Sequence, residues 1–92
     1  MKIEKIKIIK SDDRGVIYNC GKSNFISRRK GSLSSHSHEG SEIVYLVKGE
    51  IELTIGNETQ RVKAPAKYEI PENIHHAMIA LTDIEFIIDR EV

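Results

Sequence analysis

The pattern of hydrophobic and polar positions predicts short β-strands along most of the chain. Residues 5–9 (KIKII) alternate charge with isoleucine, so Ile6 and Ile8 share one face of a strand, although a helix stays an alternative there. Further strands are predicted at residues 15–20, 24–30, 43–47, 76–81 and 84–88. Isoleucine dominates the apolar residues, and branching at Cβ favours extended backbone. The pattern therefore predicts an all-β barrel or sandwich of about nine strands.

The clearest local prediction is a hairpin over residues 50–63, with the sequence EIELTI-GN-ETQRVK. A two-residue Gly-Asn connection is typical of the tight turns that need positive φ. Folding the segment there places Ile55 opposite Glu58 and fixes every other pair. The resulting pairs are Glu50 with Lys63, Glu52 with Arg61, Thr54 with Thr59, and Ile51 with Val62. Opposite charges and paired threonines then share one face, so the register is self-consistent.

Two other segments carry local signals. Asp12 and Gly15 are three residues apart in SDDRG, and a type I turn prefers Asp at its first position and Gly at its fourth. Residues 43–47 (IVYLV) are apolar at every position, so both faces of that strand need cover. One face can line a core, and an uncovered outer face would associate with another subunit. We therefore expect a homodimer.

Composition narrows the class of protein. With 92 residues we expect one domain. The formal net charge is zero, from 14 basic and 14 acidic residues, so no positive excess exists to hold nucleic acid. The N-terminal residues MKIEKIKIIK lack the uninterrupted apolar stretch of a signal peptide or membrane helix. The single cysteine, Cys20, cannot form an internal disulfide. We expect a soluble cytoplasmic protein without a nucleic-acid or membrane partner.

The histidines lie in two places, and their spacing suggests metal binding. Residues two apart on a strand point to the same side, so His36 and His38 can direct both imidazoles at one point. Glu42 follows four residues later, and two imidazoles with a carboxylate suit iron, manganese, nickel, copper or zinc. Alone, a His-x-His pair is common on solvated strands. A second histidine site in IPENIHH, far along the chain, strengthens the metal hypothesis because a barrel can bring His76 across.

The block GSLSSHSHEGSEIVYLVKGE resembles the first motif of the cupin superfamily. That motif has a glycine, His-x-His, a glutamate after three or four residues, and a second glycine after six more. His36, His38, Glu42 and Gly49 match this spacing, and Gly31 lies one residue closer than usual.

PENIHHAMIA is similar to the second cupin motif. Pro71 and His76 match it, whereas Asn73 replaces a glycine and Ala80 replaces the final asparagine. Pro65 stands at the position of the leading glycine. Asn73 is a tolerable replacement because asparagine accepts a left-handed backbone better than other non-glycine residues.

The resemblance implies a cupin-type double-stranded β-helix, or jelly-roll barrel, that binds one divalent transition metal. The implied metal ligands are His36, His38, Glu42 and His76. We expect a single cupin domain over residues 1–92. Its N-terminal strands would occupy residues 1–30, the first cupin motif residues 31–50, and the second motif residues 65–80.

Several other residues have a structural and a functional interpretation. We expect His75 to point away from the metal as a surface or interface residue, and Cys20 to be buried and inert. Arg28 and Arg29 could hold an anionic substrate, although paired arginines usually lie on a solvated face. The remaining residues in this class are Tyr68 and Met78, as cavity lining or core filling, and Glu39, as a loop carboxylate that could orient a ligand.

Three functions fit these residues. The first is a metal-dependent enzyme of oxygenase or isomerase/epimerase type, acting on a small oxygenated molecule such as an acid or sugar, because four protein ligands leave open positions on a six-coordinate metal. The second is a non-catalytic module that binds or senses a small molecule. The third is a scaffold with a structural ion. The sequence leaves the metal, the substrate and the catalytic residues open.

Overall fold

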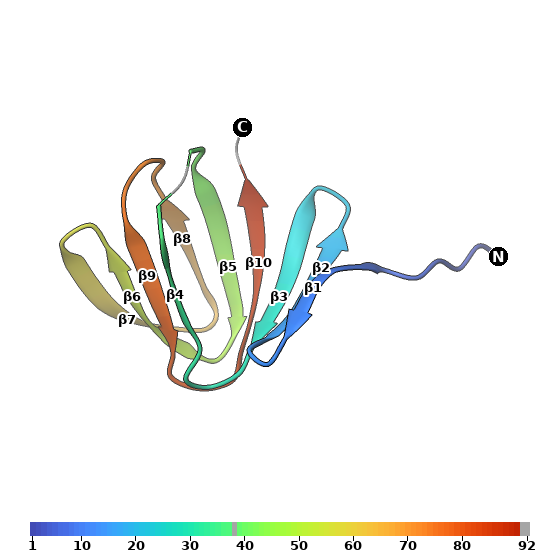
Figure 1. Ribbon diagram of the computed structural model, residues 1–92, viewed down its shortest axis with the longest axis horizontal. Coiled ribbons are helices and arrows are strands. Elements are labelled where there is room, and N and C mark those ends of the chain that lie inside the picture. Colours follow the sequence, from blue (N-terminus) through green and yellow to red (C-terminus); the bar gives the residue numbers. More distant parts are fainter. Residues whose placement is uncertain (38, 91–92) are drawn as a thin grey trace.

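The structure, a computed structural model, describes residues 1–37 and 39–90. In this part of the chain ten β-strands form two antiparallel sheets, which confirms the predicted all-β class (Figure 1). Over the same residues, no helix is long and apolar enough to span a bilayer. The strands are β1 (Lys7–Asp12), β2 (Gly15–Cys20), β3 (Ser23–Arg28), β4 (Leu33–His36), β5 (Glu42–Lys48), β6 (Glu50–Ile55), β7 (Glu58–Lys63), β8 (Ala66–Ile70), β9 (His76–Ala80) and β10 (Ile84–Arg90).

The chain repeatedly crosses between the two sheets. One sheet has the order β1-β2-β3-β10-β5-β8, and the other has the order β4-β9-β6-β7. β5 passes directly to β6 through Gly49, whose φ is +91°. A Cβ atom at this position would lie 2.4 Å from the Asp83 carbonyl oxygen, so only glycine fits the crossing.

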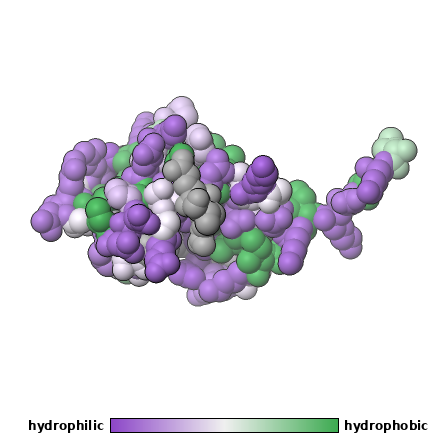
Figure 2. All heavy atoms as spheres, turned by 90° about the horizontal axis from the view of Figure 1, so that it is seen from above, coloured by the Kyte–Doolittle hydropathy of each residue, from purple (hydrophilic) through white to green (hydrophobic). Residues whose placement is uncertain are grey.

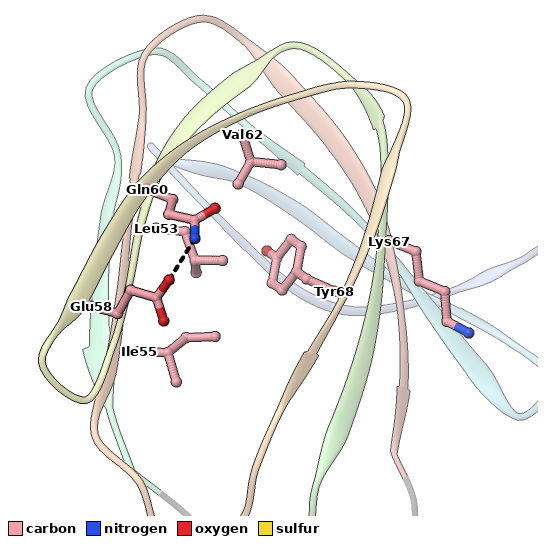
Figure 3. Close-up of a pocket in the computed structure, with 7 residues that line it drawn as sticks. All are labelled: Leu53, Ile55, Glu58, Gln60, Val62, Lys67 and Tyr68. Atoms are coloured by element: carbon pink, nitrogen blue, oxygen red, sulfur yellow. Dashed lines mark hydrogen bonds between the residues drawn. The ribbon is translucent and has the colours of Figure 1, made fainter.

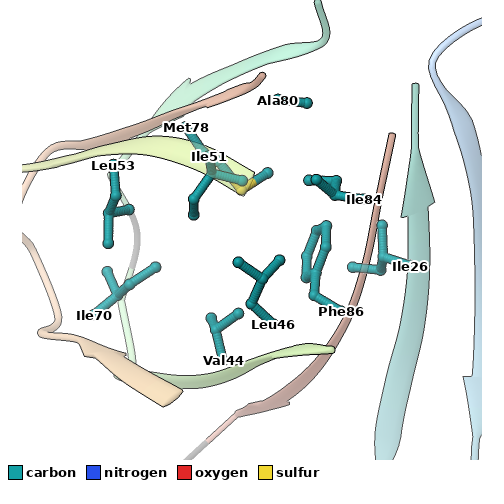
Figure 4. Packing of buried hydrophobic residues seen from close by; sticks show 10 residues of the cluster. All are labelled: Ile26, Val44, Leu46, Ile51, Leu53, Ile70, Met78, Ala80, Ile84 and Phe86. Atoms are coloured by element: carbon teal, nitrogen blue, oxygen red, sulfur yellow. The ribbon is translucent and has the colours of Figure 1, made fainter. Parts of the chain in front are cut away.

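The core lies between the sheets and is built from alternate residues of the facing strands. Val44 and Leu46 of β5 are each 1% exposed, and Ile51 of β6 is 0% exposed. The other members of the buried cluster are Ile26, Leu53, Ile70, Met78, Ala80, Ile84 and Phe86 (Figure 4). Side chains alternate across a strand, so the intervening residues face outward.

The predicted hairpin is confirmed pair by pair. β6 and β7 pair with Glu50 opposite Lys63, Glu52 opposite Arg61 and Thr54 opposite Thr59. The Arg61 Nε atom lies 2.8 Å from a Glu50 carboxylate oxygen, and the two threonine hydroxyls are 2.9 Å apart. The turn between Asp12 and Gly15 also forms as predicted.

Three predictions differ from the structure. The first strand runs over Lys7–Asp12, later than the predicted 5–9, so Ile6 precedes it. β8 (Ala66–Ile70) was not among the predicted strands, although exposed Lys67 and Glu69 alternate there with more buried residues. Cys20 is exposed rather than buried, because it ends β2 at the hairpin turn before β3.

The N-terminal residues project from the body of the molecule (Figure 2). Ile3 is 83% exposed and Ile6 is 61% exposed, so this segment adds little to the core. The molecule measures 49 × 30 × 23 Å along its principal axes.

Candidate metal centre

His36, Glu42 and His76 converge at one end of the two sheets. His36 is the last residue of β4, Glu42 the first of β5 and His76 the first of β9. One ligand atom from each side chain lies within 4.8 Å of the others. The structure therefore brings together three of the four predicted ligands. His38, the fourth, lies outside the described residues.

Strand pairing accounts for the position of the two histidines. β4 and β9 are antiparallel, and His36 pairs directly with His76. The inward face of β9 carries His76, Met78 and Ala80, which are all buried. The same alternation that builds the core thus places His76 beside His36.

The surroundings of His76 suit metal binding. Its Nδ1 atom lies 3.2 Å from the backbone carbonyl oxygen of Ile74, which can only accept a hydrogen bond. Nδ1 therefore carries the proton and donates, which places the ring's lone pair on Nε2. Metal-binding histidines commonly have such a hydrogen bond from the other ring nitrogen.

Glu42 and His76 are buried, at 3% and 5% exposed, whereas His36 is exposed at the rim. Metal–nitrogen bonds of about 2.0–2.1 Å allow two donors on one ion to lie up to about 4.2 Å apart. The ligand atoms of the three side chains lie within 4.8 Å of one another, and small side-chain rotations would bring them within the distance that one ion requires. Two imidazoles and one carboxylate therefore fit a divalent transition metal.

Loop contacts join the two segments that carry the ligands. The Gly40 backbone N–H donates to a carboxylate oxygen of Glu72 at 3.3 Å. Asn73 has a φ of +60°, which agrees with the prediction that asparagine accepts the left-handed backbone here. These contacts hold the loop after β4 against the loop before β9.

His75 lies apart from the cluster, as predicted. Its side chain is exposed, and its Nε2 atom lies 2.8 Å from the Ser35 hydroxyl. Ser35 and His36 are adjacent on β4 and so point to opposite faces of the sheet. His75 and His76 are divided between the two faces in the same way.

The cluster opens into a cavity of about 170 Å³ between the two sheets. Most of its wall is apolar. The polar residues on the wall are His36, Glu42, His76, Arg28, Ser34 and Tyr68. Tyr68 and Met78 thus line the cavity as well as filling the core, and the Tyr68 hydroxyl lies 3.8 Å from the Met78 sulfur.

Electrostatics keep Tyr68 protonated. Burial raises the pKa of the Tyr68 hydroxyl well above its ordinary value, and the carboxylate of Glu42 raises it further. The hydroxyl is therefore a hydrogen-bond donor at neutral pH. Methionine sulfur is a weak acceptor, so a ligand oxygen in the cavity would be a stronger partner.

A second, larger cavity of about 320 Å³ lies between β7 and β8 (Figure 3). Leu53, Ile55 and Val62 form its apolar wall, with Glu58 and Gln60 hydrogen-bonded to each other at its edge. Leu53 and Tyr68 line both cavities. These two side chains therefore lie where the side opening and the cavity of the His/Glu cluster adjoin.

The position of Arg28 differs from the expectation that both arginines lie on a solvated face. Arg29 is exposed, as expected for a solvated pair, but Arg28 is only 9% exposed and lines the inner cavity. Strand alternation explains the difference, because Arg28 follows buried Ile26 by two residues on β3. The same alternation is visible in the sequence NFISRR and could have identified Arg28 as the inward arginine.

Two antiparallel sheets around a cavity with converging His, Glu and His side chains define a jelly-roll barrel with a candidate metal site. Comparison with known families agrees with this class. The model of the cupin domain matches residues 27–88, and the chain belongs to the cupin family.

Solved structures share the fold at low sequence identity. An RmlC-like cupin from Shewanella frigidimarina is 18% identical, with a TM-score of 0.78 and coverage of 91% of this chain and 81% of the other. KdgF from Halomonas is 17% identical, with a TM-score of 0.75 and coverage of 91% and 86%. Oxalate decarboxylase from Bacillus subtilis, a protein with Mn(II) centres, is 17% identical, with a TM-score of 0.80 and coverage of 94% and 27%. Among curated proteins, none matches the chain in sequence.

Proposed function

We propose that the protein binds one divalent transition metal through His36, His38, Glu42 and His76. The observation that carries this proposal is the convergence of three of these side chains, two of them buried, at the end of an internal cavity. Buried Glu and His side chains gathered at one point are costly unless they share a ligand or hydrogen bonds. Iron, manganese, nickel, zinc and copper all accept this donor set.

The function we propose is that of a metal-dependent enzyme acting on a small oxygenated molecule, an acid or a sugar-like compound. Four protein ligands leave two positions on a six-coordinate ion for the substrate, water or dioxygen. The ion would polarise a carbonyl or hydroxyl, or activate oxygen, according to its identity. An oxygenase or an isomerase/epimerase is compatible with this chemistry.

Residues of the cavity would assist in defined ways. The apolar wall excludes water, which strengthens electrostatic interactions with a bound molecule. The protonated Tyr68 hydroxyl would donate a hydrogen bond to a substrate oxygen beside Glu42. The side opening between β7 and β8 would lead past Leu53 and Tyr68 to the metal.

Two measurements, made one after the other, test this proposal. Elemental analysis of protein purified without an affinity tag should give close to one transition metal per chain. The metal-loaded protein should then convert a member of a panel of hydroxy acids, keto acids and sugars. Absence of bound metal, with none taken up on addition, would contradict the metal site. Saturable binding of a panel member without conversion would instead identify the alternative, a non-catalytic binding module.

We also propose that two copies associate through the outer face of the larger sheet. Tyr18, Phe25, Ile87 and Tyr45 pair one to the next across β2, β3, β10 and β5. We call these four residues the outer row. All four are half-buried, and the Tyr18 and Phe25 ring centroids are 6.2 Å apart. A continuous apolar row on a sheet face supports a homodimer.

A cytoplasmic location stays a prediction.

A further inference from the structure

Arg28 is a buried cation on the wall of the cavity that holds the His/Glu cluster. It is the last residue of β3, where Ile26 and Arg28 both face inward. Only 9% of its surface is exposed, and it lines the cavity together with Ile17, Ile26 and Phe86. Arginine is rarely buried to this extent unless an anion accompanies it.

Among residues 1–37 and 39–90, no carboxylate lies within ion-pair distance of the Arg28 guanidinium. Over the same residues, its side chain donates one hydrogen bond, from Nη1 to the Ser27 carbonyl oxygen at 3.1 Å. A guanidinium has five N–H donors in a planar fork that matches a carboxylate. The remaining N–H groups make no hydrogen bond to the described part of the protein, and no nitrogen of Arg28 is buried without a partner. They are therefore accessible to a ligand in the cavity that Arg28 lines.

Asp12, whose charge acts on Arg28, is already engaged by another arginine. Asp12 accepts hydrogen bonds from the Arg14 backbone N–H at 2.9 Å and from Arg14 Nη2 at 3.2 Å. Arg14 itself adds a second positive charge near Arg28. Burial lowers the pKa of Arg28, and the charge of Arg14 lowers it further, against a smaller opposing effect of Asp12. One positive charge thus stays uncompensated at this end of the cavity.

We propose that the natural ligand of the cavity carries a carboxylate and that Arg28 binds it. The apolar neighbours favour a monovalent organic acid over inorganic phosphate, because a phosphate dianion needs more donors than one guanidinium supplies. Ile17, Ile26 and Phe86 would contact the carbon atoms next to the carboxylate. The fork of Arg28 would hold both carboxylate oxygens.

Strand register places the backbone of Arg28 far along the sheet from that of Glu42. Arg28 pairs with Ile84 at the start of β10, whereas Glu42 pairs with Arg90 at its end. At about 3.3 Å per residue, the two backbones are about 20 Å apart along the sheet. In this proposal the carboxylate on Arg28 anchors the ligand, and a different group of the ligand faces the His/Glu cluster on the same cavity. The anion site extends the proposed function without depending on a bound ion.

The test is an NMR titration of chelator-treated protein with propionate, propionamide and inorganic phosphate at constant ionic strength. Propionamide has the shape of propionate without its charge. Wild type and Arg29→Gln, which loses the neighbouring exposed arginine, should show saturable shifts of the Ile17 and Ile26 amides with propionate. Arg28→Gln should weaken binding about tenfold or more, and Arg28→Lys should weaken it less.

Three outcomes would overturn the proposal. They are equal binding of propionamide and propionate, tighter binding of phosphate, and unchanged propionate affinity in Arg28→Gln. His36→Ala removes a proposed metal ligand but leaves Arg28 in place, so this variant should still bind propionate saturably. The metal site and the anion site can therefore fail independently in these experiments.

Stability gives a second, independent measurement. An uncompensated buried charge destabilises a fold, so Arg28→Met without ligand should unfold at a Tm equal to or above that of wild type. A structural arginine would behave in the opposite way. A clear fall in Tm for both Arg28→Met and Arg28→Gln would show that Arg28 supports the fold, and the proposal would then be wrong.

Discussion

The imidazole rings of His36 and His76 meet edge to face, with centroids 4.4 Å apart and planes inclined by 75°. These residues are 40 positions apart in the chain, yet they form a direct pair between β4 and β9. Antiparallel pairing alone therefore brings the two cupin-like motifs together. Glu42, at the start of β5, completes the group from the opposite sheet.

This arrangement predicts that adjacent histidines differ sharply in their effect on metal binding. His76→Ala should lower metal affinity by about 100-fold or more, because a buried ligand is lost. Metal added at about 100 times the wild-type Kd should stabilise wild type by about 2.7 kcal/mol and the variant hardly at all. Thermal unfolding with and without added metal measures both.

His75→Ala is the matched control for this experiment. The His75 side chain contacts Ser35 and faces away from the cluster, so the variant should retain the metal. If His75→Ala removed the ion while His76→Ala kept it, the alignment of the second motif would be wrong by one residue.

The parts of the fold that could be predicted from sequence are those governed by local periodicity. The β6–β7 hairpin follows from a Gly-Asn turn between two strands of alternating polar and apolar residues. Its register follows from the opposite charges and paired threonines that face each other at every second position. The convergence of His36 and Glu42 with His76 required the resemblance to a known family. Spacing within each motif carries no information about which strands of a barrel become neighbours.

Arg28 and Cys20 show where residue type misleads. Arginine is usually solvated and free cysteine is usually buried, so both expectations followed average behaviour. Position within the strand decided otherwise, because Arg28 shares the inward face of Ile26 and Cys20 ends β2 at a turn. Alternation was the more informative signal for Arg28, and position at the end of a strand was the more informative signal for Cys20.

Gly49 should tolerate substitution much less than Gly21 does. Gly49→Ala would combine a positive φ of +91° with contacts of 2.4 Å to Asp83 and 2.6 Å to Thr82. We expect a loss of about 2–4 kcal/mol in the free energy of unfolding. Gly21→Ala is the control, because φ is +69° there but nothing lies within 4 Å of the added Cβ. It should cost only about 1–2 kcal/mol, and equal losses in urea unfolding would contradict the steric account.

Asp12 should titrate below its ordinary value. The side-chain and backbone hydrogen bonds from Arg14 lower the pKa of Asp12 beneath 3.8. Because the folded-state pKa is lowered, the stabilisation is present above pH 3.8 and is lost as the pH falls through the folded-state pKa. Carboxyl NMR shifts of Asp12 should show this midpoint, and Arg14→Ala should move it towards 3.8. Because Arg14→Ala keeps the backbone N–H, an unchanged midpoint would show that the side-chain hydrogen bond is not the cause.

The outer row gives a prediction about assembly that is separate from the site. Tyr45 lies in its row between Ile87 of β10 and Lys67 of β8, whose ammonium group is 5.8 Å from the Tyr45 ring centroid. Tyr45→Glu would place a charge in the proposed interface, and desolvating it should shift the protein to monomer in sedimentation velocity. Metal content should stay unchanged, because Val44 and Leu46, not Tyr45, face the cavity side of β5. Thr59→Glu adds the same charge on the exposed β7 strand of the other sheet and should leave the assembly intact. A monomeric wild type, or dissociation of both variants alike, would exclude this face as the interface.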